Sequence, residues 1–305
     1  MNHVTGWIVF HVIVFGMLII DLGVFNKKPH KIGVKEAAIN VAVWFGVAFL
    51  FNIGIYFYNG EQQALEFFTG YIIEKSLSID NIFVMIMIFS TFHIPDEYQH
   101  KILYWGILGA ILMRGAMILL GVAIVERFHW VFYIFGVFLI YSSIKMILKK
   151  DGEHIEVEKN FFVRLVKKIY PVTQEYQDGR FFVKINGVKH VTTLFLTLIV
   201  IEFTDLVFAI DSIPAIFAIT TDPFIVYTSN IFAILGLRSM YFALASVIEI
   251  FYLLKYGLGI VLGYVGVKML LIDFYHMPTL ISLIIIVGVL SISIFLSVIM
   301  PKEKK

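Results

Sequence analysis

The sequence contains no cysteine. Disulfide bonds and thiolate metal ligands are therefore excluded, and any metal ion held by this chain must bind oxygen or imidazole nitrogen. Charge is also scarce, because only 15% of the 305 residues are Asp, Glu, Lys or Arg, while 60% are hydrophobic. A soluble domain of this length could not hide so much apolar surface in its core, so we expect the chain to use lipid as a solvent.

Long uninterrupted apolar segments supply the expected membrane spans. They lack the period-2 alternation of barrel strands, and each is long enough to cross ~30 Å of hydrocarbon as a helix. We therefore expect an all-α, polytopic membrane protein, with a single transmembrane domain over residues 1–305 and about nine helices. The expected spans are 5–25, 37–58, 65–92, 102–124, 128–148, 190–219, 229–251, 256–273 and 280–299. The first has neither a basic segment nor a cleavage signal, which indicates a retained helix instead of a signal peptide.

The connections between these spans alternate in charge. Loop 26–36 holds four Lys, loop 149–189 holds nine Lys or Arg, and the last four residues include three Lys, whereas the loops 59–64, 125–127, 220–228 and 274–279 hold only Arg127. The positive-inside rule then predicts an external N-terminus and a cytoplasmic C-terminus, which requires an odd number of spans.

The cytoplasmic loop 149–189 joins the two halves of the chain and, at about 40 residues, is too short for an independent enzymatic domain. Its segment 161–169 has the periodicity of an interfacial amphipathic helix, which we expect to lie on the inner leaflet. Further along, residues 181–188 predict a short hairpin around Asn186-Gly187.

An acidic motif occurs twice. Both copies read acid, five residues, then Asp-[Asn/Ser]-Ile, and they start at Glu74 and at Asp205. Two basic residues follow each copy. They are 31 residues apart after the first copy and 30 residues apart after the second. These pairs are Arg114 with Lys145, and Arg238 with Lys268. We interpret spans 3–5 and 6–8 as an internal repeat.

Each repeat unit contains three spans, so the two units enter the membrane from opposite sides and form an inverted pair. Transporters built in this way hold their substrate near the bilayer midplane, between the units and often where a helix is interrupted. Pro214 supplies such an interruption, because its missing N–H frees the carbonyl of Ile210 as a candidate ligand.

Five acidic residues fall well inside predicted spans, where each unpaired charge costs at least ~2.5 to 3.5 kcal/mol. They are Glu74, Asp80, Glu202, Asp205 and Asp211. Three basic residues are their candidate partners, namely Lys75, Arg114 and Arg238. Five acids and three bases leave a formal charge of −2, which one divalent cation or two protons would balance.

The predicted metal site combines both repeats. It comprises Asp80, Asn81, Asp211 and Ser212. Glu74 and Asp80 are six residues apart, hence rotated by ~240° and ~9 Å apart along a helix, so they form separate stations. We place Glu74, Glu202 and Asp205 along the path to the site or as proton acceptors. All these donors are hard oxygens, which suit Mg²⁺, Ca²⁺ or Mn²⁺ and not Zn²⁺ or Cu⁺.

Structural roles compete with this interpretation. Asp80 with Arg114, and Asp211 with Arg238, are a less favoured alternative as buried ion pairs that fix helix register. Lys145 and Lys268 lie near span ends and suit interfacial anchoring, and His11 suits a hydrogen-bonded structural role.

The two acidic motifs, together with Ile234-Leu-Gly-Leu-Arg238-Ser-Met-Tyr and Ile272-Asp-Phe-Tyr-His276, resemble those of the TerC family, its Alx-type members most closely. The resemblance extends from the first span to the ninth. It implies export of manganese across the bacterial inner membrane, and related members are implicated in loading metal into secreted proteins. The metal-path positions that it implies are Asp80, Asn81, Asp205, Asp211 and Ser212.

The leading hypothesis is therefore secondary transport of Mn²⁺, coupled to protons, with Ca²⁺ as the alternative ion. We expect no enzymatic activity, no cofactor besides the transported ion and no nucleic-acid partner. A membrane assembly or metallochaperone role through loop 149–189 stays open. An intramembrane aspartyl protease is disfavoured, because the chain has no Gly-x-Gly-Asp motif and five membrane acids instead of two. Direct handling of tellurite is disfavoured because an acidic path repels an oxyanion.

Overall fold

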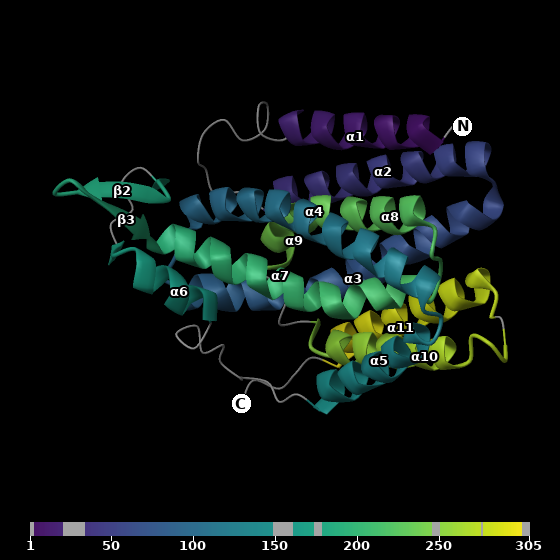
Figure 1. The fold of residues 1–305 in the computed structure, drawn as a ribbon. Helices are drawn as coiled ribbons and strands as arrows, with labels where there is room; N and C mark the ends of the chain where they lie inside the picture. The colour runs from purple at the N-terminus through teal and green to yellow at the C-terminus, as the bar shows by residue number, and fades with distance from the viewer. Residues whose placement is uncertain are drawn as a thin grey trace.

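The computed structural model describes residues 3–20, 34–148, 161–173, 179–245, 251–275 and 277–300. Within these ranges the chain is almost entirely helical, and the long helices run side by side with three short strands at one end of the bundle (Figure 1). The helices are α1 (His3–Ile20), α2 (Val34–Asn59), α3 (Glu61–Thr91), α4 (Asp96–Arg127), α5 (Val131–Leu148), α6 (Phe161–Ile169), α7 (Thr193–Phe217), α8 (Pro223–Leu235), α9 (Leu237–Leu244), α10 (Leu254–Leu270) and α11 (Thr279–Ile299).

Every expected span corresponds to helix in the described residues, which confirms the all-α class of the transmembrane part. By length and apolar composition, five helices qualify as membrane spans, namely α2, α4, α5, α7 and α11, and α1 contributes a shorter apolar segment, Thr5–Ile19. The total of nine spans stays a prediction. Residues 21–25, 246–250, most of loop 26–36 and the basic tail lie outside the described residues.

The bounds predicted for the seventh span, 229–251, are wrong. The helix starts six residues earlier, at Pro223, because the Asp222 carboxylate caps it by accepting hydrogen bonds from the backbone N–H of Phe224 at 2.8 Å and of Ile225 at 3.3 Å. Proline suits the first helical position, where no N–H is needed. The span is also divided, since α8 ends at Leu235 and α9 begins after Gly236.

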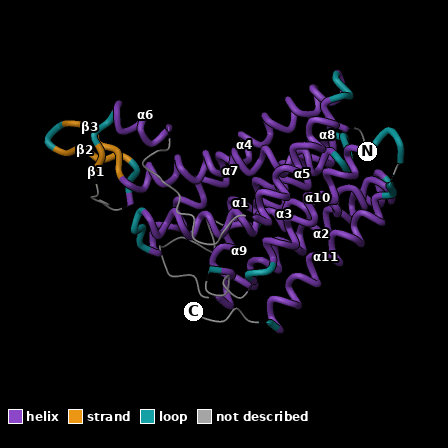
Figure 2. The backbone as a smooth tube through the Cα atoms, turned by 90° about the horizontal axis from the view of Figure 1, so that it is seen from below, coloured by secondary structure: helices purple, strands orange, loops and turns teal. Residues whose placement is uncertain are grey.

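The helices of the two predicted repeat units pack crosswise. Helix α3 contacts α7 and α8, α4 contacts α7 and α8, and α5 contacts α10. If α3, α4 and α5 correspond to α7, α8–α9 and α10, this is the set of contacts that a pseudo-two-fold relation produces, since α3 on α8 is the counterpart of α7 on α4. The tube view shows α3 beneath α4 and α7 in the same bundle (Figure 2). These contacts are those that an inverted repeat would produce, and the repeat itself stays a prediction.

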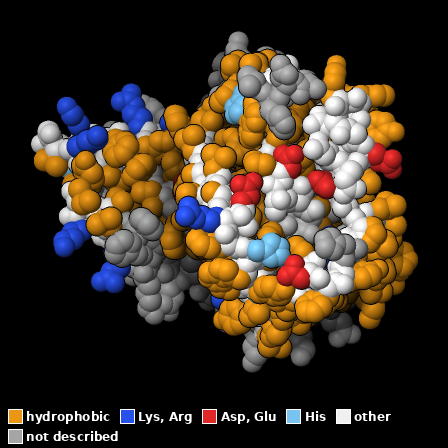
Figure 3. Space-filling model, turned by 45° about the vertical axis from the view of Figure 1, so that its right-hand side comes forward, with side chains coloured by type: hydrophobic (Ala, Val, Ile, Leu, Met, Phe, Trp, Pro, Cys, Tyr) orange, Lys and Arg blue, Asp and Glu red, His pale blue; other side chains and the backbone are white. Residues whose placement is uncertain are grey.

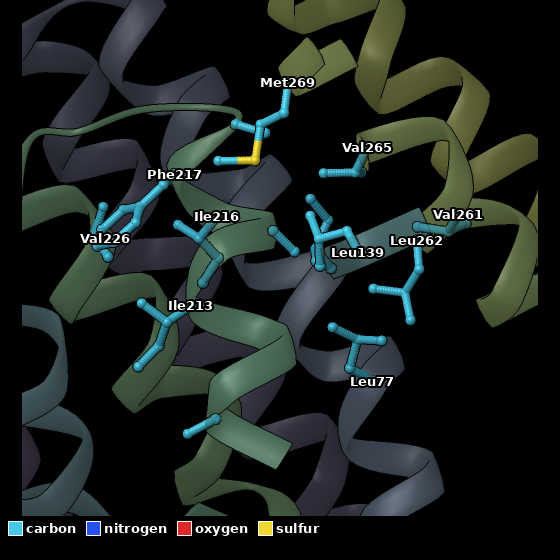
Figure 4. Packing of buried hydrophobic residues seen from close by; sticks show 14 of the residues in the cluster. Leu77, Leu139, Ile213, Ile216, Phe217, Val226, Val261, Leu262, Val265 and Met269 are labelled. Atoms are coloured by element: carbon cyan, nitrogen blue, oxygen red, sulfur yellow. The ribbon is translucent and has the colours of Figure 1, made fainter. Parts of the chain in front are cut away.

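Helices α5 and α10 approach each other closely at two glycines. A Cβ added at Gly266 would lie 2.9 Å from the backbone oxygen of Gly136, and one added at Gly136 would lie 3.0 Å from that of Gly266. Small residues permit such close backbone contact in membranes. Beside it, a buried cluster joins Leu139 of α5 to apolar side chains of α10 and α7 (Figure 4).

The connection between the halves folds into α6 and a three-stranded sheet of β1 (Val172–Thr173), β2 (Phe182–Ile185) and β3 (Val188–Thr192), in the order β1-β3-β2. Strands β2 and β3 are antiparallel, and Asn186 (φ 50°) with Gly187 (φ 81°) form the turn. Positive φ at both central residues is the signature of a two-residue hairpin. The predicted hairpin and amphipathic helix are thus confirmed, whereas the parallel strand β1 was not predicted.

Candidate metal path

Helices α3 and α7 bring their acidic motifs to one small cavity between them. Its volume is ≈ 20 Å³, room for about one water molecule or bare ion. The lining includes all four residues of the predicted central site, Asp80 and Asn81 from α3 and Asp211 and Ser212 from α7. Leu77, Met146, Phe208 and Leu262 supply its apolar walls, and Glu74 and Arg114 complete it.

Arg114 of α4 is the electrostatic centre of this region and is only 1% exposed. Its Nε and Nη2 donate to the two carboxylate oxygens of Asp205 at 3.0 and 2.7 Å, and its Nη1 donates to Glu74. A bidentate guanidinium–carboxylate pair combines charge with fixed geometry. One arginine therefore neutralises part of the charge on the first acid of both repeat copies.

Asn230 of α8, which is fully buried, completes the network. Its Oδ1 accepts from Arg114 Nη1 at 3.1 Å, and its Nδ2 donates to Glu74 Oε2 at 3.2 Å. Ser212 Oγ lies 3.5 Å from the same Nη1 and links the network to the cavity. Asn230 is not among the residues predicted from the sequence, although an Asn within an otherwise apolar span is itself a signal of a polar contact in lipid.

The predicted ion pairing was wrong for Arg114. Its guanidinium binds Glu74 and Asp205, and not Asp80 as the structural alternative supposed. The reason is helical geometry: Asp80 lies six residues and ~9 Å along α3 from Glu74, beyond the reach of a guanidinium already held between two carboxylates. For the other supposed pair, the structure places Asp211 and Arg238 at different cavities. Asp211 accepts a hydrogen bond from Ser142 Oγ of α5 at 2.7 Å, another contact that the sequence analysis missed.

A second cavity, of ≈ 10 Å³, is lined by Asp205. Its polar lining consists of Glu202, Asp205 and Arg238. The Glu202 carboxyl group rests against Gly109 of α4, where any Cβ would overlap it. Glu202 and Asp205 share one face of α7, as their spacing predicts.

The three predicted acids of the path thus divide between the two cavities. Glu74 lines the first cavity, Glu202 lines the second, and Asp205 lines the second while pairing with Arg114. Within the described residues, no group of three or more His, Asp or Glu side chains is close enough to hold a metal ion. Asp80, Asn81, Asp211 and Ser212 therefore share one cavity, and the metal-binding role of all the predicted residues stays a prediction.

Two further basic residues of the spans, Lys75 and Arg238, contact α8 and α4. Lys75 Nζ donates to the carbonyl of Ala233 at 3.1 Å, in the last turn of α8, and lies against Gly236 at the break before α9. A cation suits the negative end of a helix dipole. Arg238 Nη1 donates to His100 Nε2 of α4 at 3.0 Å.

A family comparison identifies the chain. The model of the integral membrane protein TerC family matches residues 59–305. The chain belongs to the TerC family. It is 49% identical over 297 residues to an uncharacterized membrane protein, STKORF319, of Myxococcus xanthus, which covers 97% of this chain and 93% of the relative.

Relatives named "Putative membrane-bound redox modulator Alx" are also similar. The protein of Salmonella typhi is 45% identical over 300 residues (95% of this chain, 93% of the relative), and that of Escherichia coli K12 is 45% identical over 293 residues (93% and 91%). No solved structure matches this TerC chain. The resemblance to Alx-type TerC proteins is confirmed, and with it a multi-pass integral membrane protein of bacterial type.

Two other polar residues of this TerC protein make structural hydrogen bonds, one within a helix and one between helices. His11 Nδ1 donates to the carbonyl of Trp7 at 2.8 Å, as expected of a structural histidine. Lys268 Nζ donates to Ser282 Oγ of α11 at 3.0 Å. Both residues can be explained without a role in metal binding.

Proposed function

We propose that this TerC protein is a secondary transporter that exports a divalent cation, with Mn²⁺ as the substrate, across the bacterial inner membrane. One observation carries the proposal: the second acids of the two motif copies, Asp80 and Asp211, line the same cavity with Asn81 and Ser212. Two carboxylates, an amide and a hydroxyl form a hard oxygen set, which suits Mn²⁺, Mg²⁺ or Ca²⁺.

The charge balance supports a cation as substrate. In their ionised forms Glu74 and Asp205 with Arg114 carry a net charge of −1, and Asp80 and Asp211 add two carboxylates beside the cavity, with Lys145 as a nearby positive charge for Asp211. Such a charge deep in lipid requires compensation. A divalent cation provides it when bound, and protons provide it on the return step.

Flux measurements test the proposal. Proteoliposomes of wild type, Asp80→Asn and Asp211→Asn are loaded with Mn²⁺, and efflux is followed with a metal-sensitive dye. Either substitution removes one of two carboxylate ligands, so both variants are expected to lose most Mn²⁺ flux. Asp273→Asn is the matched control, because Asp273 is exposed after α10 and lines neither cavity. Full flux in both cavity variants would contradict the proposal, and competition by Ca²⁺ would measure ion selectivity.

The orientation is part of the same proposal: the N-terminus is external and the C-terminus cytoplasmic. The absence of cysteine permits single-cysteine labelling without prior substitution. An impermeant reagent is expected to reach Asn59→Cys from the external side and Lys184→Cys from the cytoplasmic side. Labelling of both from one side would refute the arrangement.

The same two aspartates are also what an intramembrane aspartyl protease would need, namely two carboxyl groups from different helices beside one cavity. That function predicts cleavage of membrane substrates without any need for Mn²⁺. A metallochaperone or assembly role through loop 149–189 predicts that deleting this loop removes function, while the transporter proposal predicts that flux largely survives. Since this chain lacks cysteine, it has no thiol of its own for the redox role in its relatives' name.

A further inference from the structure

The unit formed by α6 and the three strands carries charge of one sign. Its described residues, 161–173 and 179–192, include six Lys or Arg and no Asp or Glu, and all six basic side chains are exposed. They are Arg164, Lys167, Lys168, Arg180, Lys184 and Lys189. In the space-filling view, Lys and Arg lie mainly at the end of the molecule that carries the strands, whereas Asp and Glu gather at the opposite end (Figure 3).

Exposed apolar side chains lie among these charges. On α6, Leu165 is 42% and Ile169 is 62% exposed, and their spacing of four residues places them on one face of the helix. Arg164 and Lys168 lie beside that face. An apolar stripe bordered by basic residues is typical of helices that lie in the headgroup region of a membrane.

The hairpin places like charges together. Lys184 and Lys189 are direct cross-strand partners, a pairing that destabilises a sheet unless an anion is present. Lys189 Nζ lies 4.5 Å from the centre of the exposed Phe182 ring on the same face. The hairpin thus offers positive charge and an aromatic ring together.

Other contacts hold this unit at the end of the helical bundle. Strand β3 ends at Thr192, and α7 begins at the next residue, while α6 packs against α7. On the other side, Lys101 Nζ of α4 donates to the carbonyl of Gly179 at 2.8 Å. The basic side chains are therefore fixed where two transmembrane helices reach the membrane surface.

We propose that this basic unit binds the anionic phospholipid headgroups of the adjacent leaflet, with Leu165 and Ile169 inserted at the level of the first acyl carbons. Charge complementarity selects the partner, because a basic surface next to the bilayer attracts anionic lipid. The other residues of loop 149–189 carry three Lys and six Asp or Glu, so the whole loop keeps a charge of +3. The opposite end of the bundle, where Asp and Glu side chains gather, would repel the same lipid (Figure 3).

The full-length protein tests this directly. An environment-sensitive fluorophore is attached to Leu165→Cys, and the protein is placed in nanodiscs of phosphatidylcholine alone or of phosphatidylcholine mixed with phosphatidylglycerol. We expect blue-shifted emission in the anionic discs, reduced by high salt. The shift should disappear when Arg164, Lys167 and Lys168 are all changed to Gln. The same fluorophore at Asn59→Cys, at the acidic end, is the control and should not respond to lipid charge.

Each other outcome overturns the proposal. Equal emission in both kinds of disc would exclude a role for lipid charge. A shift produced by inorganic phosphate in neutral discs would identify a free-phosphate site, and a shift produced only by added RNA or soluble protein would identify a macromolecular partner. Thermal melting of the triple variant shows whether its fold is retained. If it unfolds, Lys184→Gln with Lys189→Gln, on the hairpin alone, must lower the shift for the proposal to stand.

Discussion

The two predicted repeat units, α3–α5 and α7–α10, share a sequence pattern but use its arginine differently. Arg114 lies within the continuous helix α4 and binds the first acid of both units. Arg238 follows the break between α8 and α9 and binds His100. The two arginines cannot both occupy equivalent positions between Glu74 and Asp205, because the guanidinium of Arg114 already fills that space. The asymmetry shows that the first unit supplies the central charge compensation.

The largest expected effect comes from breaking this asymmetry at its centre. Arg114→Met leaves two buried carboxylates without their cation, and we expect a loss of roughly 3–5 kcal/mol of stability, as is typical when one member of a buried pair is removed. Arg127→Met, at an exposed arginine of the same helix, is the control and should cost clearly less. Thermal melting of both variants in detergent, followed by size-exclusion chromatography, makes the comparison. Equal losses would contradict the special position of Arg114.

A rescue experiment isolates the electrostatic cause. Adding Glu74→Gln and Asp205→Asn to Arg114→Met removes the uncompensated charges, so melting should recover in large part. If the triple variant melts no higher than Arg114→Met alone, lost packing of the long side chain explains the effect instead.

The next largest loss of stability is expected at the contact between α5 and α10, to which each unit contributes one glycine. Because each glycine would meet the backbone oxygen of the other, Gly136→Ala and Gly266→Ala should both destabilise, by about 1–3 kcal/mol from overpacking. Gly288→Ala on α11 is the control, since a Cβ there meets nothing within 4 Å. Melting curves that leave Gly136→Ala and Gly266→Ala unchanged would argue against this close approach.

The smallest expected effect concerns one hydrogen bond between the units. Ser142→Ala removes the donor to Asp211, and a bond of about 1 kcal/mol corresponds to roughly a 5-fold rise in the Mn²⁺ concentration that gives half-maximal flux. Ser143→Ala is the matched control, because its Oγ donates to the carbonyl of Gly259 instead. A similar rise in both variants would mean that Ser142 does not act through Asp211.

Local features of this protein could be predicted from its sequence, and the helices, hairpin and amphipathic segment followed from periodicity and turn chemistry. The sequence Asp222-Pro223 also indicates the start of α8, because Asp is a preferred N-cap residue and Pro suits the first helical position. The partners of Arg114 could not be read, since Asp205 and Asn230 are 91 and 116 residues away in the chain. Spacing along one helix places residues on a face, but only the packing of α4 against α7 and α8 decides which carboxylate that face meets.

The candidate site divides in the same way. The repeated motif singled out Asp80, Asn81, Asp211 and Ser212 before any packing was known, because acids within apolar spans are costly and therefore conspicuous. That they share one cavity depends on the contact between α3 and α7, which no spacing rule supplies. The hydrogen bond from Ser142 of α5 to Asp211 could not be predicted either, because it also depends on how the helices pack.

Binding of Mn²⁺ to the purified protein, followed by electron paramagnetic resonance, tests the central claim most directly. The account predicts that wild type binds the ion and that Asp80→Asn and Asp211→Asn each weaken binding strongly, with Asp273→Asn unchanged. Undiminished Mn²⁺ binding in the double variant Asp80→Asn with Asp211→Asn would contradict a metal site shared by α3 and α7.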